Sequence, residues 1–277
     1  MSESTTGRAG RGRASGAEIL GAEVRAWRLH AGLSQRELGE KAQYGQQYVA
    51  KVESGERLAS PEFCRACDQI FGSPESFARL RERATQSGYP DWFIPYLQLE
   101  RQATSILNYS VALVMGMLQT EDYATAVFRA SHPRDGVDEI KARVARRLKR
   151  RVIMERSAPP LLWCVLDESC LRREVGGRHV MHDQLSRLVK DAQSPHITLQ
   201  VLPWSSGAPS THLGFTLLKF AEDPDLLYVE NPLSGQVIDS PAVVADAAVT
   251  YDRLRADALS PEASLVLMRK VMEEYTP

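Results

Sequence analysis

Two adjacent glutamines, Gln46 and Gln47, stand where a short helix is predicted to begin. A glutamine amide offers both a donor and an acceptor, so it can form two hydrogen bonds with the N6 and N7 atoms of adenine. In a helix-turn-helix, the first residues of the second helix lie at the base edges of the major groove. The two amides therefore predict recognition of DNA bases, provided that the surrounding residues form that motif.

The residues before the glutamines predict a first short helix and a turn. Ser34 and Glu37 have the Ser-x-x-Glu spacing of a capping box, which begins a helix whose Leu38 faces inward. Residues 43–45 interrupt the helical pattern, so the first helix is expected to end there.

A second helix is expected to begin with Gly45 as its N-cap. Val49 and Val52 lie three residues apart and predict the buried side of this helix. Gln46, Gln47, Ala50 and Lys51 are then left facing solvent.

The stretch "GLSQRELGEKAQYGQQYVAKVESGERLASP" resembles the repressor-type (XRE) helix-turn-helix of the Cro kind. The resemblance implies that Gln35 contacts a phosphate and that Glu53 is structural. It departs from the family pattern at Gln43, which replaces a turn glycine, and at Gly45, which replaces a Ser or Thr cap. The alternative is a helical hairpin with a solvated, amide-rich surface. The predicted DNA contacts are Ser34, Gln35, Gln46, Gln47, Tyr48, Lys51 and Arg57.

Three segments are predicted along the chain. Residues 1–16 contain no large apolar side chain and predict a disordered arm, whose arginines at 8, 11 and 13 either enter a minor groove or form a free tail. Residues 17–87 predict a five-helix DNA-binding domain. A cluster of Ser, Gly and Pro then marks a boundary, and residues 88–277 predict an α+β domain with a small antiparallel sheet.

Within the α+β domain, short apolar runs alternate with helical patterns. The expected helices are 91–107, 119–130, 138–156, 178–192, 241–257 and 261–275, and the expected strands are 161–167, 197–203, 214–220 and 226–231. Ser240 and Ser260 each precede a proline and are expected to cap the last two helices.

The strings Leu-Gln-Thr-Glu-Asp-Tyr (118–123) and Leu-Asp-Glu-x-x-Leu-Arg-Arg (166–173) resemble the C-terminal domain of actinobacterial, antitoxin-like (WhiJ-like) regulators. Met115 departs from that family, which usually has Pro before Gly116. The resemblance implies a regulator encoded beside a small partner protein, and it names no ligand.

Two charged clusters in this domain are candidate binding sites. The basic run "KARVARRLKRR" (141–151) places Arg143, Arg147 and Arg150 on one helical face, which suits DNA phosphate, an acidic partner or an anionic ligand. A solvated helix face is the alternative. Asp167 and Glu168 precede Arg172 and Arg173, so they form either an acid and base pair or an ion-paired strand end.

Three further patterns have a structural alternative. The loop 203–214 carries Trp204 and His212 and is either a lid over a ligand or a plain hairpin connection. Cys64 and Cys67 lie one turn apart and are expected in the core, because a second pair of zinc ligands is missing nearby. His179 and His182 have the spacing of two ligands without the Glu of a metalloprotease motif.

Composition limits the remaining classes. The net charge is −1, and residues 1–87 hold 13 basic and 11 acidic side chains, so DNA binding by one copy is expected to be weak. Without a phosphate-binding glycine loop, a nucleophile elbow, a membrane-length apolar run or a signal peptide, we expect a cytoplasmic, non-enzymatic protein with no cofactor or metal. The prediction is a homodimer on an inverted DNA repeat, with a small protein as a further partner. The rival hypothesis is an enzyme that carries an accessory helix-turn-helix.

Overall fold

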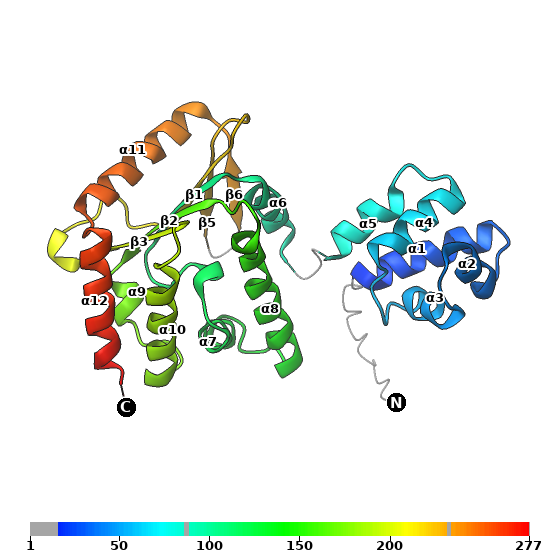
Figure 1. Cartoon of the computed structure of the whole chain (residues 1–277), viewed down its shortest axis with the longest axis horizontal. Helices are drawn as coiled ribbons and strands as arrows, with labels where there is room; N and C mark the ends of the chain where they lie inside the picture. Colours follow the sequence, from blue (N-terminus) through cyan, green and yellow to red (C-terminus); the bar gives the residue numbers. More distant parts are fainter. Residues whose placement is uncertain (1–15, 86–88, 232–233, 277) are drawn as a thin grey trace, which may run out of the picture. The chain divides into compact units, whose positions relative to one another are not determined.

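The computed structural model describes residues 16–85, 89–231 and 234–276 (Figure 1). The chain divides between Tyr89 and Pro90 into two compact units. Of the predicted arm, residues 1–15 lie outside the described residues, and Gly16 is already the first residue of a helix. The predicted boundary between residues 87 and 88 also lies outside the described residues. None of the described helices is long and apolar enough to cross a membrane.

The N-terminal unit is helical, as predicted. Ser34 begins the second helix through the expected capping box, in which Glu37 N donates to Ser34 Oγ (3.2 Å) and Ser34 N donates to Glu37 Oε2 (2.7 Å). Ser60 caps the fourth helix by accepting from Phe63 N (3.1 Å). The helices in residues 16–85 are α1 (Gly16–His30), α2 (Gln35–Ala42), α3 (Gln46–Glu53), α4 (Pro61–Phe71) and α5 (Ser76–Thr85).

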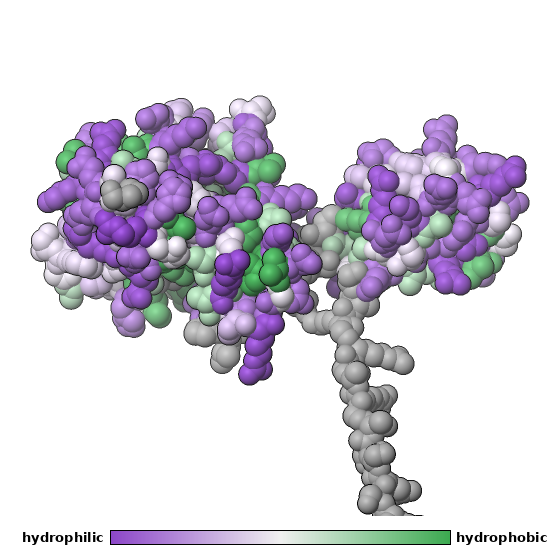
Figure 2. Space-filling model, turned by 90° about the horizontal axis from the view of Figure 1, so that it is seen from below, coloured by the Kyte–Doolittle hydropathy of each residue, from purple (hydrophilic) through white to green (hydrophobic). Residues whose placement is uncertain are grey.

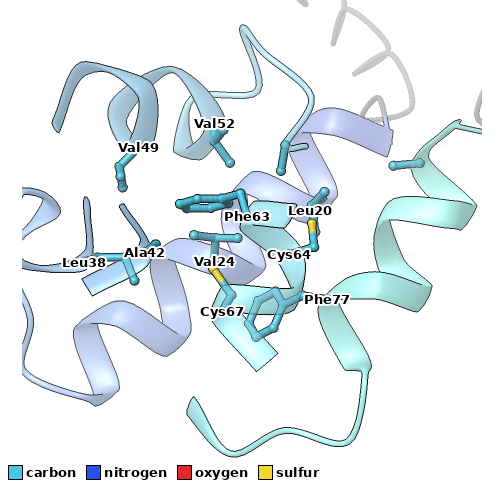
Figure 3. Close-up of a cluster of buried hydrophobic side chains, with 12 residues drawn as sticks. Leu20, Val24, Leu38, Ala42, Val49, Val52, Phe63, Cys64, Cys67 and Phe77 are labelled. Atoms are coloured by element: carbon cyan, nitrogen blue, oxygen red, sulfur yellow. The ribbon is translucent and has the colours of Figure 1, made fainter. Parts of the chain in front are cut away.

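One apolar core holds these helices together (Figure 3). Phe63 of α4 lies between Val24 of α1 and Val52 of α3, and none of the three is more than 1 % exposed. Cys64 and Cys67 are fully buried in the same core, and this burial raises the pKa of the Cys64 thiol to about 11. The predicted packing role of the two cysteines is therefore confirmed.

The turn between α2 and α3 is strained at one residue. Gln43 has φ 62° and ψ 38°, the left-handed conformation that costs a side-chain-bearing residue about 1–2 kcal/mol. Its backbone N–H satisfies the carbonyl of Glu40 at the end of α2 (3.3 Å). The turn therefore keeps the geometry that a glycine would adopt without strain.

The C-terminal unit is built on a six-stranded mixed sheet, so the expectation of a small antiparallel sheet is wrong. The strand order is β3-β2-β1-β4-β5-β6. β2 pairs in parallel with β1 and β3, whereas β4 pairs antiparallel with β1 and β5, and β5 with β6. The strands are β1 (Ser105–Ser110), β2 (Leu161–Asp167), β3 (Ile197–Leu202), β4 (Phe215–Lys219), β5 (Leu226–Glu230) and β6 (Gly235–Ile238).

The expectation of a small antiparallel sheet was wrong chiefly because the sequence pattern did not predict β1. The helical pattern expected for 91–107 ends at Gln102, and the chain then becomes extended as β1. β1 lies in the middle of the sheet, where it joins the parallel half to the antiparallel half. Because a parallel pair needs a crossover, the helices between β1 and β2 and between β2 and β3 supply it. β6 is also absent from the predicted strands, whereas β2, β3, β4 and β5 agree with them to within one residue at each end.

Helices cover both faces of this sheet (Figure 1). Among the described helices, α11 alone lies over one face, where its Tyr251 donates to the carbonyl of Trp163 in β2 (2.7 Å). The other face carries most of the remaining helices, with α12 packed on α10 and β3. Ser260 caps α12 as expected, but Ser240 forms no side-chain cap on α11. The helices are α6 (Ile94–Gln102), α7 (Glu121–Ser131), α8 (Val137–Lys149), α9 (Ser169–Arg172), α10 (Arg178–Asp191), α11 (Pro241–Asp257) and α12 (Pro261–Glu274), with 3-10 turns η1 (Asp91–Phe93), η2 (Gly116–Leu118), η3 (Arg150–Glu155) and η4 (Trp204–Ser206).

Replacing Gln43 by glycine should stabilise the turn between α2 and α3. We expect Gln43→Gly to raise the free energy of unfolding of the N-terminal unit by about 1 kcal/mol, because the left-handed strain is removed. Backbone amide exchange of α2 and α3 in the full chain measures this change.

The matched control is Gln69→Gly, which makes the same change at an exposed position inside α4. Here glycine should destabilise the helix by about 1 kcal/mol. Two destabilising substitutions would contradict the assignment of strain to Gln43.

Candidate nucleic-acid interface

The helix α3 presents the two glutamines to solvent. Val49 and Val52 are at most 1 % exposed and anchor one side of the helix in the core. Gln46 and Gln47 are exposed, and Gly45 before them is extended, with φ −72° and ψ 152°. The first turn of α3 therefore exposes the amide groups of Gln46 and Gln47 to solvent. The opposite side of the helix is fixed by its packing in the core.

Two glycines allow α3 to lie close to its neighbours. A Cβ on Gly39 of α2 would meet the backbone oxygen of Tyr44 at 2.6 Å, so only glycine admits the chain leading into α3. A Cβ on Gly21 of α1 would overlap the backbone oxygen of Val52, near the end of α3. Both contacts involve backbone atoms, so a side chain at either glycine would displace α3.

A buried charged network joins the first three helices. Arg28 of α1 donates from Nε to Glu53 Oε1 (2.5 Å) and from Nη2 to Glu53 Oε2 (2.9 Å), while its Nη1 donates to the carbonyl of Leu33 (2.8 Å). Gln35 at the start of α2 donates from Nε2 to Glu53 Oε2 (2.9 Å). The side chains of Arg28 and Glu53 are 8 % and 3 % exposed, and the hydrogen bonds to Glu53 hold the pKa of Arg28 above its ordinary value. This network fixes the last residue of α3 against α1 and α2.

The network shows which contacts Gln35 and Glu53 make within the domain. Glu53 is structural, as the resemblance implies. Gln35 is half-buried, and its amide N–H is already directed at Glu53. Ser34 is exposed, but its hydroxyl caps α2. The phosphate contact expected of Gln35 remains a prediction.

Tyr48, a predicted DNA contact, is half-buried and packs against the core of the domain. Its hydroxyl accepts from Ser60 N (2.7 Å), and its ring lies 4.5 Å from that of Tyr44 and 5.2 Å from that of Phe63. The guanidinium of Arg57 lies 4.7 Å above the Tyr48 ring and is itself exposed. Tyr48 therefore positions Arg57 beside α3.

Lys51 lies one turn beyond the glutamines and is exposed. Its Nζ is 3.3 Å from a carboxylate oxygen of Glu56, and both side chains are more than half exposed. An exposed pair of this kind contributes at most about 1 kcal/mol, so a phosphate can replace Glu56 as the partner of Lys51.

In the C-terminal unit, the three candidate arginines of the basic run contact residues of the same chain. Arg143 pairs with Asp135 (2.7 Å), and Arg147 donates to Gln119 (2.9 Å). Arg150 pairs with Glu100 (2.6 Å), whose side chain is only 2 % exposed. These guanidinium groups thus hold α8 and η3 against neighbouring segments.

The second charged cluster lies where β2 and β3 end. Glu168 pairs with Arg172 (2.5 Å) and accepts from Trp204 N (2.9 Å), while Arg172 lies 5.6 Å from the centre of the exposed Trp204 ring. Burial raises the pKa of Glu168, but the hydrogen bonds from Arg172 and Trp204 N outweigh it and lower that pKa overall. His212 is exposed in the loop before β4.

Sequence patterns did not identify Arg28 as the partner of Glu53. Arg28 follows Leu20 and Val24 at spacings of four residues, so a charged side chain lies on the buried side of α1. A buried charge requires a partner, and this spacing is the signal that would have indicated one. Nothing local indicated that the partner would be Glu53.

The fold and the site together define a protein with an N-terminal helix-turn-helix domain and a C-terminal α+β domain. Residues 19–80 match the model of a helix-turn-helix domain, which indicates a DNA-binding regulator. Residues 93–270, more than half of the chain, match the family described as "Domain of unknown function (DUF5753)", and the chain belongs to this family. Neither the curated proteins nor the solved structures contain a match.

Removing the charge of Glu53 should destabilise the helix-turn-helix domain. Glu53→Gln leaves the buried Arg28 without a carboxylate, and we expect it to lower the free energy of unfolding of this unit by about 3 kcal/mol. Amide exchange in α1, α2 and α3 measures the loss. Glu40→Gln is the control, because Glu40 pairs with Arg36 at an exposed site and should change stability by less than about 0.5 kcal/mol. Equal effects of the two variants would contradict the role of the network.

Arg150 should stabilise the C-terminal unit, because its guanidinium pairs with the buried carboxylate of Glu100. Arg150→Met leaves Glu100 without its cation, and we expect a loss of about 3 kcal/mol in the C-terminal unit, measured by amide exchange of α6 and α8. Lys149→Met, at an exposed neighbouring position, should change stability by less than about 0.5 kcal/mol. Full stability of Arg150→Met would instead favour a binding role.

Proposed function

We propose that this chain is a sequence-specific transcriptional regulator of the XRE type, in which Gln46 and Gln47 of α3 recognise bases. The proposal is supported by the exposure of both amides on the first turn of α3. The last residue of this helix, Glu53, is fixed by its ion pair with Arg28. A rigid frame matters because base recognition depends on placing donors and acceptors within hydrogen-bond distance of the base edges.

The surrounding charges supply the part of DNA binding that does not depend on sequence. Lys51 and Arg57 are exposed beside the glutamines, and we propose that both contact phosphates. Their number is small, and residues 1–87 have a net charge of only +2. One copy should therefore bind weakly, and we propose that two copies bind an inverted repeat with half-sites roughly 34 Å apart.

The C-terminal domain is proposed to serve regulation. Its resemblance to antitoxin-like regulators favours a small protein as partner and control of the chain's own gene as the output. We propose no enzymatic activity, because the Glu168 carboxylate is held by Arg172 and by Trp204 N and is therefore engaged within the fold. Ligand sensing by the cluster of Glu168, Arg172 and Trp204 is a further proposed role of this domain.

Removing both amides should separate specific from non-specific DNA binding. We expect Gln46→Ala with Gln47→Ala to abolish the preference for a selected operator, at a cost of about 1–3 kcal/mol for each bidentate contact. Weak, salt-sensitive binding to any duplex should remain, because Lys51 and Arg57 are unchanged. Fluorescence anisotropy with operator and random duplexes measures both affinities.

The control is Gln69→Ala, which removes an exposed amide from α4 and should leave both affinities unchanged. Equal losses on operator and random DNA would contradict base recognition by the two glutamines.

A further inference from the structure

Helix α11 has apolar side chains on two opposite sides. Its inner side buries Val244, Tyr251 and Leu254 against the sheet. The helix also exposes Val249, at 53 %, together with three alanines on the same side. A helix of this composition normally packs on both sides, whereas a surface helix has a polar outer side. We call the exposed side the outer stripe, formed by Ala242, Ala245, Val249 and Ala256.

The outer stripe differs from the side of the unit that carries most other helices. Seen from below in Figure 2, that side of the C-terminal unit is mostly hydrophilic, with small hydrophobic patches. On α11, the stripe runs nearly the full length of the helix, about 21 Å from Ala242 to Ala256. Its small side chains permit another helix to approach to about 8 Å between axes, the close end of the usual range.

Two charged residues identify the partner that fits this stripe. Asp246 and Arg253 are exposed and lie seven residues apart, so they project along the same edge of the stripe, about 10 Å from one another. Among the described residues, neither side chain takes part in an ion pair or hydrogen bond. Arg255, by contrast, stacks on Trp163 and lies 3.4 Å from Asp252.

We propose that a second copy of this chain packs its α11 antiparallel against the outer stripe. A two-fold axis midway between Asp246 and Arg253 passes close to Val249. It brings Asp246 opposite Arg253 of the second copy, and the same pair forms again across the axis. A surface that is complementary to itself in this way is the requirement for a closed two-fold dimer.

The inference deepens the proposed function, because it rests on the proposal that two copies bind one inverted repeat and names the surface that joins them. The contact belongs to the C-terminal unit, so it does not use Gln46, Gln47 or any other proposed DNA contact. Dimerisation and DNA binding can therefore be tested separately.

A charge-swap experiment on the full chain without DNA tests the contact. Analytical ultracentrifugation should give twice the chain mass of 30.9 kDa for the unchanged protein. Asp246→Arg alone, or Arg253→Asp alone, places like charges together twice, and each should weaken dimerisation at least about tenfold. The double variant, with both substitutions, restores two opposite-charge pairs and should return the dissociation constant to within about threefold of the original.

Three results would overturn the inference: a monomeric parent protein, single variants that dimerise as well as the parent, or a double variant as weak as the single ones. Both residues are exposed, so circular dichroism should show unchanged thermal unfolding of all variants when each is compared as a monomer. Binding to the selected operator is measured on the same samples. A dimer that follows the charge swaps but binds no operator would reject the proposed function and leave the α11 contact standing.

Discussion

The ion pair between Arg28 and Glu53 is the constraint on which the placement of α3 depends. It connects the apolar side of α1 with the last residue of α3, and Gln35 extends it to the first residue of α2. Both charges are almost fully buried, so neither can separate from the other without leaving an uncompensated charge in the core. The proposed recognition of bases by Gln46 and Gln47 requires a fixed helix, and this ion pair and the packing of Val49 and Val52 hold α3 in place.

The C-terminal unit depends on buried pairs of the same kind. Arg150 and Arg151 follow α8 directly and pair with Glu100 and Asp191, carboxylates that are 2 % and 4 % exposed. These pairs attach the crossover between β1 and β2 to α6 and α10. Four arginines of the basic run, Arg143, Arg147, Arg150 and Arg151, thus contact residues of the same chain. The proposed functions divide accordingly, with DNA recognition in the N-terminal unit and assembly in the C-terminal one.

Local signals in the sequence predicted much of the fold. The capping box at Ser34 and Glu37, the proline that begins α12, and the apolar runs of β2 and β3 involve residues close in the chain, and the structure agrees with each. Long-range pairing was not predictable in this way. β1 has only six residues, and its central place depends on partners 56 positions away in β2 and 106 or more positions away in β4. The position of Gln46 and Gln47 on α3 could be predicted from the spacing of nearby residues. The partner of Arg28 could not, because Glu53 lies 25 positions away in the chain.

Selection from a pool of random DNA duplexes tests whether α3 recognises bases. The full chain is mixed with the pool at about 150 mM salt, where non-specific phosphate binding is much weakened, and the retained duplexes are sequenced. If two copies recognise bases through α3, one inverted repeat with half-site centres about one helical turn apart should be enriched. Retained sequences without a common motif would contradict base recognition by α3.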